Sequence, residues 1–152
     1  MKNEEENIIH RVQAGILSWY EFGLDSSVLY IGDKEPVYDY LQQLAHEEKI
    51  HEVCLISPEN LSEICLSGRK YDYVISIAAF EKTKDVRSVL KEMYSVLSGD
   101  GHLLLGMNNR FGIRYFCGDR DKYTHRNFDG IENYRRAYSK AEDTFCGRMY
   151  SL

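Results

Sequence analysis

Four short, largely apolar runs alternate with stretches of helical periodicity, and this alternation limits the folds open to the chain. The expected strands are Val28–Ile31, Glu52–Ser57, Tyr71–Ala78 and His102–Met107. The first contains no charged residue, as expected for a strand covered on both faces. Strands that alternate with helices at this spacing predict βαβ units, a parallel sheet and helices on both of its faces.

The intervals between these runs carry helix signals. The predicted helices are residues 7–20, 36–48, a short helix from Ser57-Pro58-Glu59 to near Gly68, residues 85–97, and a last one opened by Ser139-Lys140-Ala141-Glu142. Ser57 supplies an expected N-cap and Pro58 a first-turn proline. The run Ser98–Gly101 is expected to end the fourth helix with glycine.

The bulk composition is that of a folded globular chain. It has 152 residues, of which 43% are hydrophobic and 28% charged, and this length suits one domain. No apolar run approaches the ~20 residues that span a bilayer. The acidic start, Met1–Glu6, lacks the features of a signal peptide, so a cytoplasmic location is predicted. The four cysteines show no metal-binding spacing, and no metal site is expected.

Charge is distributed unevenly along the chain. The net charge is -5, yet residues 108–152 hold nine of the 19 Lys and Arg and only six of the 24 Asp and Glu. An anionic partner could bind this basic, tyrosine-rich segment, although the composition favours the alternative of a solvated surface with internal ion pairs. No nucleic-acid recognition motif is present, and a nucleic-acid partner is not expected.

Ligands of parallel sheets bind at the carboxyl ends of the strands, at the point where the strand order reverses. Gly32 and Asp33 follow the first expected strand, and Glu59 lies just beyond the second. Gly32 permits close approach to the backbone. The carboxylate of Glu59 can accept two hydrogen bonds, as from a ribose. An ordinary turn and favourable helix-terminal charge remain the alternatives.

The third and fourth strand ends offer different chemistry. Ala79 and Phe80 provide a small residue and a ring for stacking on a flat ligand, with core packing as the alternative. Asn108, Asn109 and Arg110 offer two carboxamides and a guanidinium for a polar substrate, or simply build a turn. No nucleophile–base pair is recognisable, so catalytic residues stay unassigned.

Several segments together resemble a known family. They are "ILSWYEFGLDSSVLYIG", "YDYVISIAAFE", the stretch from "VLSGDGHLLLGMNNRFG" to "FDGIENY", and "RRAYSKAED". They resemble class I S-adenosylmethionine-dependent methyltransferases of a bacterial type associated with cell-surface polysaccharide biosynthesis. The resemblance implies a Rossmann-like three-layer α/β sandwich with a mostly parallel sheet, and methyl transfer from S-adenosylmethionine. It predicts one domain over residues 1–152, with an N-terminal helix region (1–26), a βα core (27–107) and a basic C-terminal segment (108–152).

The sequence departs from that family in three places. The cofactor loop reads Gly32-Asp33-Lys34-Glu35-Pro36, with one glycine. The interval 58–70 is too short for the helix and strand that relatives carry there. The final hairpin of the family's sheet is missing, which predicts either a fragment of a longer protein or an open strand edge covered by a partner, a second copy or the tail.

Two hypotheses therefore stand side by side. In the first, the chain is a small methyltransferase that binds S-adenosylmethionine at Gly32, Asp33, Glu59, Ala79 and Phe80. Its substrate, a small molecule or a glycan precursor, then lies near Asn108, Asn109 and Arg110. In the second, it is a catalytically silent binding or assembly module that no longer binds this cofactor.

Overall fold

The structure is a computed structural model that describes residues 15–33, 36–77, 79–140 and 144–151. Most of the helix expected at residues 7–20 lies outside these ranges. Its described part contains a short 3-10 helix, η1 (Gly15–Leu17). The capping box expected at Ser139–Glu142 also lies partly outside them.

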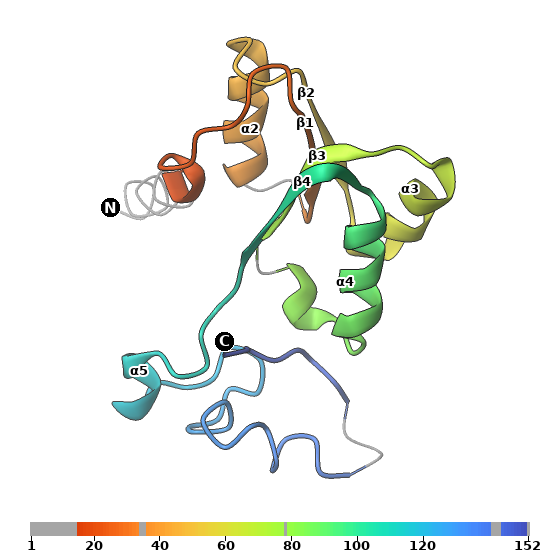
Figure 1. The fold of residues 1–152 in the computed structure, drawn as a ribbon. Helices are drawn as coiled ribbons and strands as arrows, with labels where there is room; N and C mark the ends of the chain where they lie inside the picture. The colour runs from red at the N-terminus through yellow and green to blue at the C-terminus, as the bar shows by residue number, and fades with distance from the viewer. Residues whose placement is uncertain (1–14, 34–35, 78, 141–143, 152) are drawn as a thin grey trace.

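A four-stranded sheet forms the centre of the protein (Figure 1). Its strands are β1 (Ser27–Ile31), β2 (Glu52–Ile56), β3 (Tyr71–Ile77) and β4 (Leu97–Gly106), in the order β2-β1-β3-β4. Every neighbouring pair is parallel. The expected α/β fold of Rossmann-like type, with a parallel sheet reduced in strand number, is therefore confirmed.

Helices cover both faces of the sheet, which gives three layers (Figure 1). Helix α2 (Pro36–His46) lies on one face. The helices α3 (Leu61–Ser67) and α4 (Val86–Ser95) lie on the other. Pro36 opens α2, as its fixed φ favours at a first helical position.

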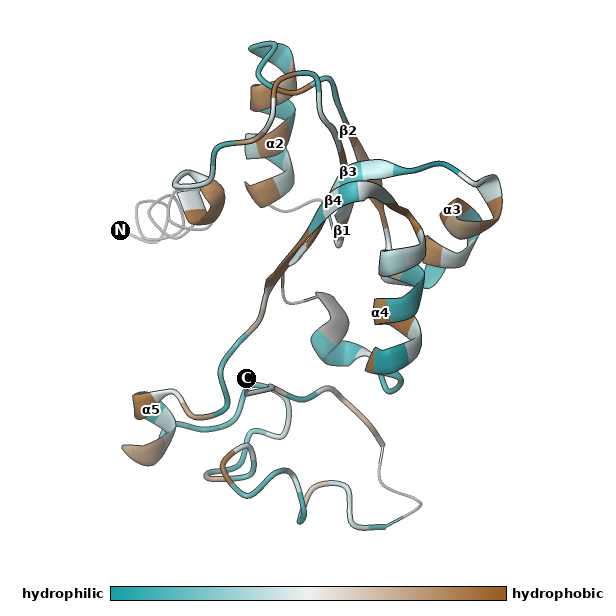
Figure 2. Ribbon diagram, in the orientation of Figure 1, coloured by the Kyte–Doolittle hydropathy of each residue, from teal (hydrophilic) through white to brown (hydrophobic). Residues whose placement is uncertain are grey.

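Strand β1 divides its side chains between the two apolar cores. Val28 and Tyr30 face the core beneath α2, whereas Leu29 and Ile31 face the core beneath α3 and α4. All four are fully buried. Removing such a side chain from water contributes about 1.5–3 kcal/mol, so this short strand anchors both layers. Apolar residues gather on the strands and the sheet-facing sides of the helices, whereas much of the chain after β4 is hydrophilic (Figure 2).

Helix boundaries follow local signals at two positions. The Asp85 side chain caps α4 by accepting a hydrogen bond from the Ser88 backbone N–H at 3.0 Å. Gly68 ends α3 in the left-handed conformation, with φ of 70°. Such a conformation favours glycine because it has no Cβ. The segment after β2 begins as a 3-10 helix, η2 (Pro58–Asn60), and Ser57 makes no side-chain cap bond there.

The glycine stop expected at Ser98–Gly101 is wrong. Helix α4 ends at Ser95, and Leu97 already belongs to β4. Sheet pairing explains the difference, because the Tyr71 N–H donates to the Val96 carbonyl at 2.8 Å and Tyr71 pairs with Leu97. The register then jumps to the pair Tyr73 and His102, so the glycine-containing segment forms an irregularity within β4.

Asp72 ties three strands together near their amino ends. One carboxylate oxygen accepts hydrogen bonds from the backbone N–H and the hydroxyl of Ser27 in β1, both at 2.8 Å. The other accepts from the Ser98 hydroxyl in β4 at 3.2 Å. The backbone hydrogen bond from Ser27, followed by the hydroxyl bonds, lowers the pKa of Asp72 below its ordinary value of 3.8.

We predict that Asp72→Asn lowers the free energy of unfolding at pH 7 by about 1–3 kcal/mol, because these bonds have a charged acceptor. The folded-state pKa lies below the unfolded one, so this stabilisation is full above the unfolded pKa. It is lost as the pH falls through the folded pKa. Urea unfolding at pH 7 and below pH 3 should show the difference from wild type shrinking in acid. Asp100→Asn, at an exposed position, is the control; an equal loss there would contradict the prediction.

Candidate functional site

The sheet has one topological switch point. From β1 the chain leads to β2 on one side, and the next strand, β3, pairs on the other side of β1. The connections after β1 and β3 therefore diverge at the carboxyl ends of these strands. In open parallel sheets this divergence leaves a crevice for a ligand. Four of the five predicted cofactor positions follow β1 or β3, and Glu59 follows β2.

At the tip of β1, the packing around Gly32 leaves little room for a side chain. A Cβ at this position would lie 3.2 Å from the ring of Tyr30, which is fully buried and stacks on Tyr38. The Gly32 N–H donates to the Ile56 carbonyl at 2.9 Å, so this donor is occupied by the sheet. Asp33 is exposed.

The tip of β2 lies beside that of β1, because Ile31 and Ile56 are register partners. Glu59 follows three residues later in η2 and is exposed. The structure thus brings Gly32, Asp33 and Glu59 to one edge of the sheet.

Ala79 and Phe80 begin η3 (Ala79–Lys82), soon after β3 ends at Ile77. They therefore lie at the same sheet edge, next to the tip of β1. The structure describes only their backbone, so stacking by the Phe80 ring stays a prediction.

Glu81 is the buried polar centre of this edge, and its importance was missed from the sequence. Its side chain is fully buried. One carboxylate oxygen accepts hydrogen bonds from the Asn108 backbone N–H at 2.5 Å and from the Asn108 amide at 3.2 Å. The other accepts from the Tyr123 hydroxyl. The Glu81 carbonyl also accepts from the Arg148 N–H at 2.9 Å. Glu81 therefore joins the tip of β3 to three points in the segment that follows β4.

The three predicted substrate residues have different hydrogen-bond partners. Asn108 is tied to Glu81, whereas Asn109 is exposed and its side-chain oxygen accepts from the Phe111 N–H at 2.9 Å within its own turn. The Arg110 backbone N–H donates to the Tyr150 carbonyl at 3.0 Å. Its guanidinium donates to Ser151, Gly130 and Asn133 within the C-terminal segment. Of these three residues, only Asn108 forms hydrogen bonds with Glu81, just beyond the tip of β3.

Residues 108–140 and 144–151, called the tail below, lie beyond the carboxyl end of β4 (Figure 1). Within the described residues, β4 pairs only with β3, and the tail adds one short helix, α5 (Ile113–Phe116), and isolated bridges. The tail is therefore joined to the segment after β3 through Glu81, and its described residues form no further strand of the sheet.

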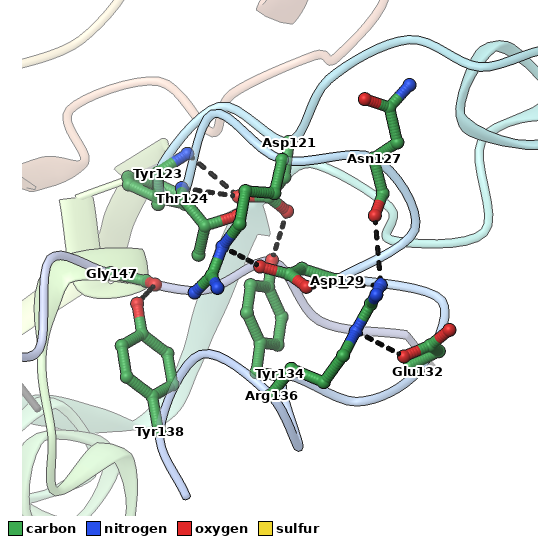
Figure 3. A network of polar contacts seen from close by, with 11 residues as sticks. Asp121, Tyr123, Thr124, Asn127, Asp129, Glu132, Tyr134, Arg136, Tyr138 and Gly147 are labelled. Atoms are coloured by element: carbon green, nitrogen blue, oxygen red, sulfur yellow. Dashed lines mark hydrogen bonds and ion pairs between the residues drawn. The ribbon is translucent and has the colours of Figure 1, made fainter. Parts of the chain in front are cut away.

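Two buried carboxylates hold the tail in shape (Figure 3). Asp121 accepts from the backbone N–H groups of Tyr123 and Thr124 at 2.8 and 3.0 Å and from the Tyr134 hydroxyl at 2.8 Å. Asp129 lies between the guanidinium groups of Arg126 at 3.0 Å and Arg136 at 3.5 Å. Burial raises the pKa of Tyr134, with the Asp121 carboxylate adding to the shift. These polar contacts connect parts of the tail that have little regular secondary structure.

Tyr123 connects that network to the strand tips. Burial, and then the hydrogen bond to Glu81, raise the pKa of its hydroxyl. Its ring lies against the backbone of Gly147, where a Cβ would come within 2.6 Å. Gly147 also has a φ of 133°, so both space and conformation require glycine.

Comparison with protein families agrees with the fold. A family model described as a methyltransferase domain matches residues 15–105. The match covers more than half of the chain, and the chain therefore belongs to this methyltransferase domain family, in agreement with a class I S-adenosylmethionine-dependent type. The matched segment includes the tips of β1, β2 and β3 and ends before the tail. A comparison with curated proteins gives no match.

Across the described residues, no three His, Cys, Asp or Glu side chains are arranged to hold a metal ion. In the same ranges, no helix has the length and apolar character needed to cross a membrane.

We predict that Tyr123→Phe lowers the free energy of unfolding by about 1–3 kcal/mol, because a donor to a buried carboxylate is lost. Amide hydrogen exchange should accelerate at Asn108 and through the tail, with less effect in β1. Tyr94→Phe removes a hydroxyl from an exposed ring and should leave both quantities nearly unchanged. Equal effects of the two substitutions would show that Tyr123 does not anchor the tail.

Proposed function

We propose that this chain is a methyltransferase-like protein that binds S-adenosylmethionine at the tips of β1, β2 and β3. Gly32, Asp33, Glu59, Ala79 and Phe80 line the proposed cofactor site, and the acceptor binds towards Asn108, Asn109 and Arg110. The observation that carries this proposal is the switch point between β1 and β3, inside the segment that matches the methyltransferase family.

The residues at this edge fit the nucleoside half of the cofactor. The exposed side chains of Asp33 and Glu59 are available to ligand hydroxyls, and Gly32 presents no side chain. A carboxylate after the second strand is suited to the two ribose hydroxyls. The helix α2 that follows the loop contributes the positive end of its dipole.

Bound S-adenosylmethionine would supply an electrophilic methyl group on a sulfonium sulfur. The chain must then hold the acceptor in line with that methyl group, which is mainly a matter of orientation. Glu81 acts here as a positioning residue, because it fixes the Asn108 amide and the tail beside the crevice. We propose a cell-surface polysaccharide precursor as the acceptor and the cytoplasm as the place of reaction, both from the family resemblance.

A second candidate is a binding or assembly module without methyl transfer. It is favoured by the single-glycine loop and by Gly32, whose N–H is already bonded to Ile56. In that case the edge of β4, which pairs only with β3 among the described residues, is the proposed place for a protein partner or a second copy.

Calorimetric titration with S-adenosylmethionine and S-adenosylhomocysteine separates the two candidates. We predict micromolar dissociation constants for the wild-type chain, and at least about tenfold weaker binding in Glu59→Ala, since two hydrogen bonds to a charged acceptor are lost. Glu63→Ala changes another exposed glutamate on the neighbouring helix α3 and should bind like wild type. No heat up to millimolar ligand would favour the silent module.

A further inference from the structure

Two guanidinium groups of the tail converge on one uncharged oxygen. Arg110 donates from Nη1 and Arg148 from Nη2 to the Asn133 side-chain oxygen, at 3.2 and 2.9 Å. Arg110 also donates from Nε to the Ser151 hydroxyl at 3.0 Å and from Nη1 to the Gly130 carbonyl at 3.3 Å. Both arginines are half-buried, and every one of these acceptors is neutral.

Two other arginines of the tail are neutralised by carboxylates. Arg126 and Arg136 contact the buried Asp129, as Figure 3 shows for Arg136. Within the described part of the tail, neither Arg110 nor Arg148 has a carboxylate at ion-pair distance. Withdrawing two positive charges from water costs free energy unless an anion compensates them.

Arg148 also has unused hydrogen-bonding capacity. Its Nε is shielded from solvent and makes no hydrogen bond within the described residues. The guanidinium carbon lies 5.6 Å from the ring centre of Tyr134 and 5.3 Å from that of Tyr150. These rings hold the cation in place without neutralising it.

An open pocket of about 410 Å³ lies beside Arg110 and Asn133, the residue whose side-chain oxygen Arg110 shares with Arg148. It is lined by Arg110, Ile131, Glu132, Asn133 and Arg135. The carboxylate of Glu132 is engaged by Arg136 Nε at 2.8 Å, which leaves Arg110 and Arg135 as the cations facing the pocket. The volume is in the range of small-molecule sites, so it can hold an anion together with part of the molecule that carries it.

The backbone next to the Asn133 side chain is in an unfavourable conformation at Tyr134. Asn133 and Tyr134 have φ of 57° and 58°, a left-handed geometry that is unfavourable for a side chain as large as tyrosine. The Tyr134 hydroxyl holds this geometry by donating to Asp121 at 2.8 Å and accepting from the Met149 N–H at 2.7 Å. Such strain is found at ligand-binding positions, where the surrounding structure maintains it.

We propose that Arg110 and Arg148, with Arg135 at the rim, bind the phosphate group of a phosphorylated small-molecule acceptor. Two planar guanidinium groups match the geometry of phosphate oxygens, and their joint charge matches a phosphate dianion better than a carboxylate. As a statement about the acceptor, this rests on the proposed methyl transfer. Phosphate binding itself does not require the cofactor.

The location agrees with that role. Arg110 lies two residues after Asn108, which is bonded to Glu81 just beyond β3. A phosphate held by Arg110 thus lies beyond the tips of β3 and β4. The remainder of the acceptor can then extend towards the crevice between β1 and β3.

The test uses inorganic phosphate as the probe and acetate at equal ionic strength for comparison. Phosphate binding to the full chain is followed by calorimetry and by the ¹H–¹⁵N resonances of the arginine Nε groups. We expect saturable millimolar binding, with the Arg148 Nε signal shifting and acetate binding at least tenfold more weakly. Arg110→Gln should weaken phosphate binding about tenfold or more, as expected for lost charge-assisted hydrogen bonds.

Two further variants control for charge and folding. Arg120→Gln removes the same charge from an exposed tail position and should change phosphate affinity less than twofold. Arg135→Gln alters the exposed rim without breaking a tail contact, and we expect a loss of about threefold or more. No saturable phosphate binding, equal binding of acetate, or equal weakening by Arg120→Gln would overturn the proposal. Phosphate binding without S-adenosylmethionine binding would reject only methyl transfer, and the reverse result would reject only the phosphate site.

Discussion

Burial of β1 on both faces is the constraint on which the architecture depends. Its residues Val28–Ile31 are fully buried, and they alternate between the core under α2 and the core under α3 and α4. A strand in that position must have strand neighbours on both sides to satisfy its backbone, and β2 and β3 provide them. The switch point, and with it the candidate crevice, follows from this central placement.

A second layer of organisation depends on buried carboxylates. Glu81 joins the tip of β3 to Asn108, Tyr123 and the backbone of Arg148, while Asp121 and Asp129 order the tail itself. Hydrogen bonds to buried charges need specific geometry, so they can fix a segment that has little regular secondary structure. The family match ends before this segment. The core therefore carries the features that the family model describes, and the buried carboxylates connect the tail to it.

Much of the fold could be predicted, because apolar runs and helix caps are local signals. The strands β1, β2 and β3 lie within one residue of their predicted bounds. Asp85 caps the beginning of α4, and Gly68 ends α3, as such residues usually do. The predicted beginning of β4, at His102, was wrong, because the strand begins at Leu97. Glycines at 99 and 101 indicate a stop, but pairing with Tyr71 takes the chain into the sheet at Leu97. Long-range pairing of that kind overrides a local signal.

The sequence by itself determined the layered α/β class and the gathering of Gly32, Asp33 and Glu59 at one sheet edge, because parallel strands bring their carboxyl ends together. Only the tertiary structure decided that Glu81 is buried among Asn108 and Tyr123. It alone also brought Arg110 to Arg148, residues separated by nearly the whole tail. The physical reason is that periodicity encodes which face of a helix or strand is buried. Contacts between polar side chains far apart in the sequence depend instead on which segments the tertiary fold brings together.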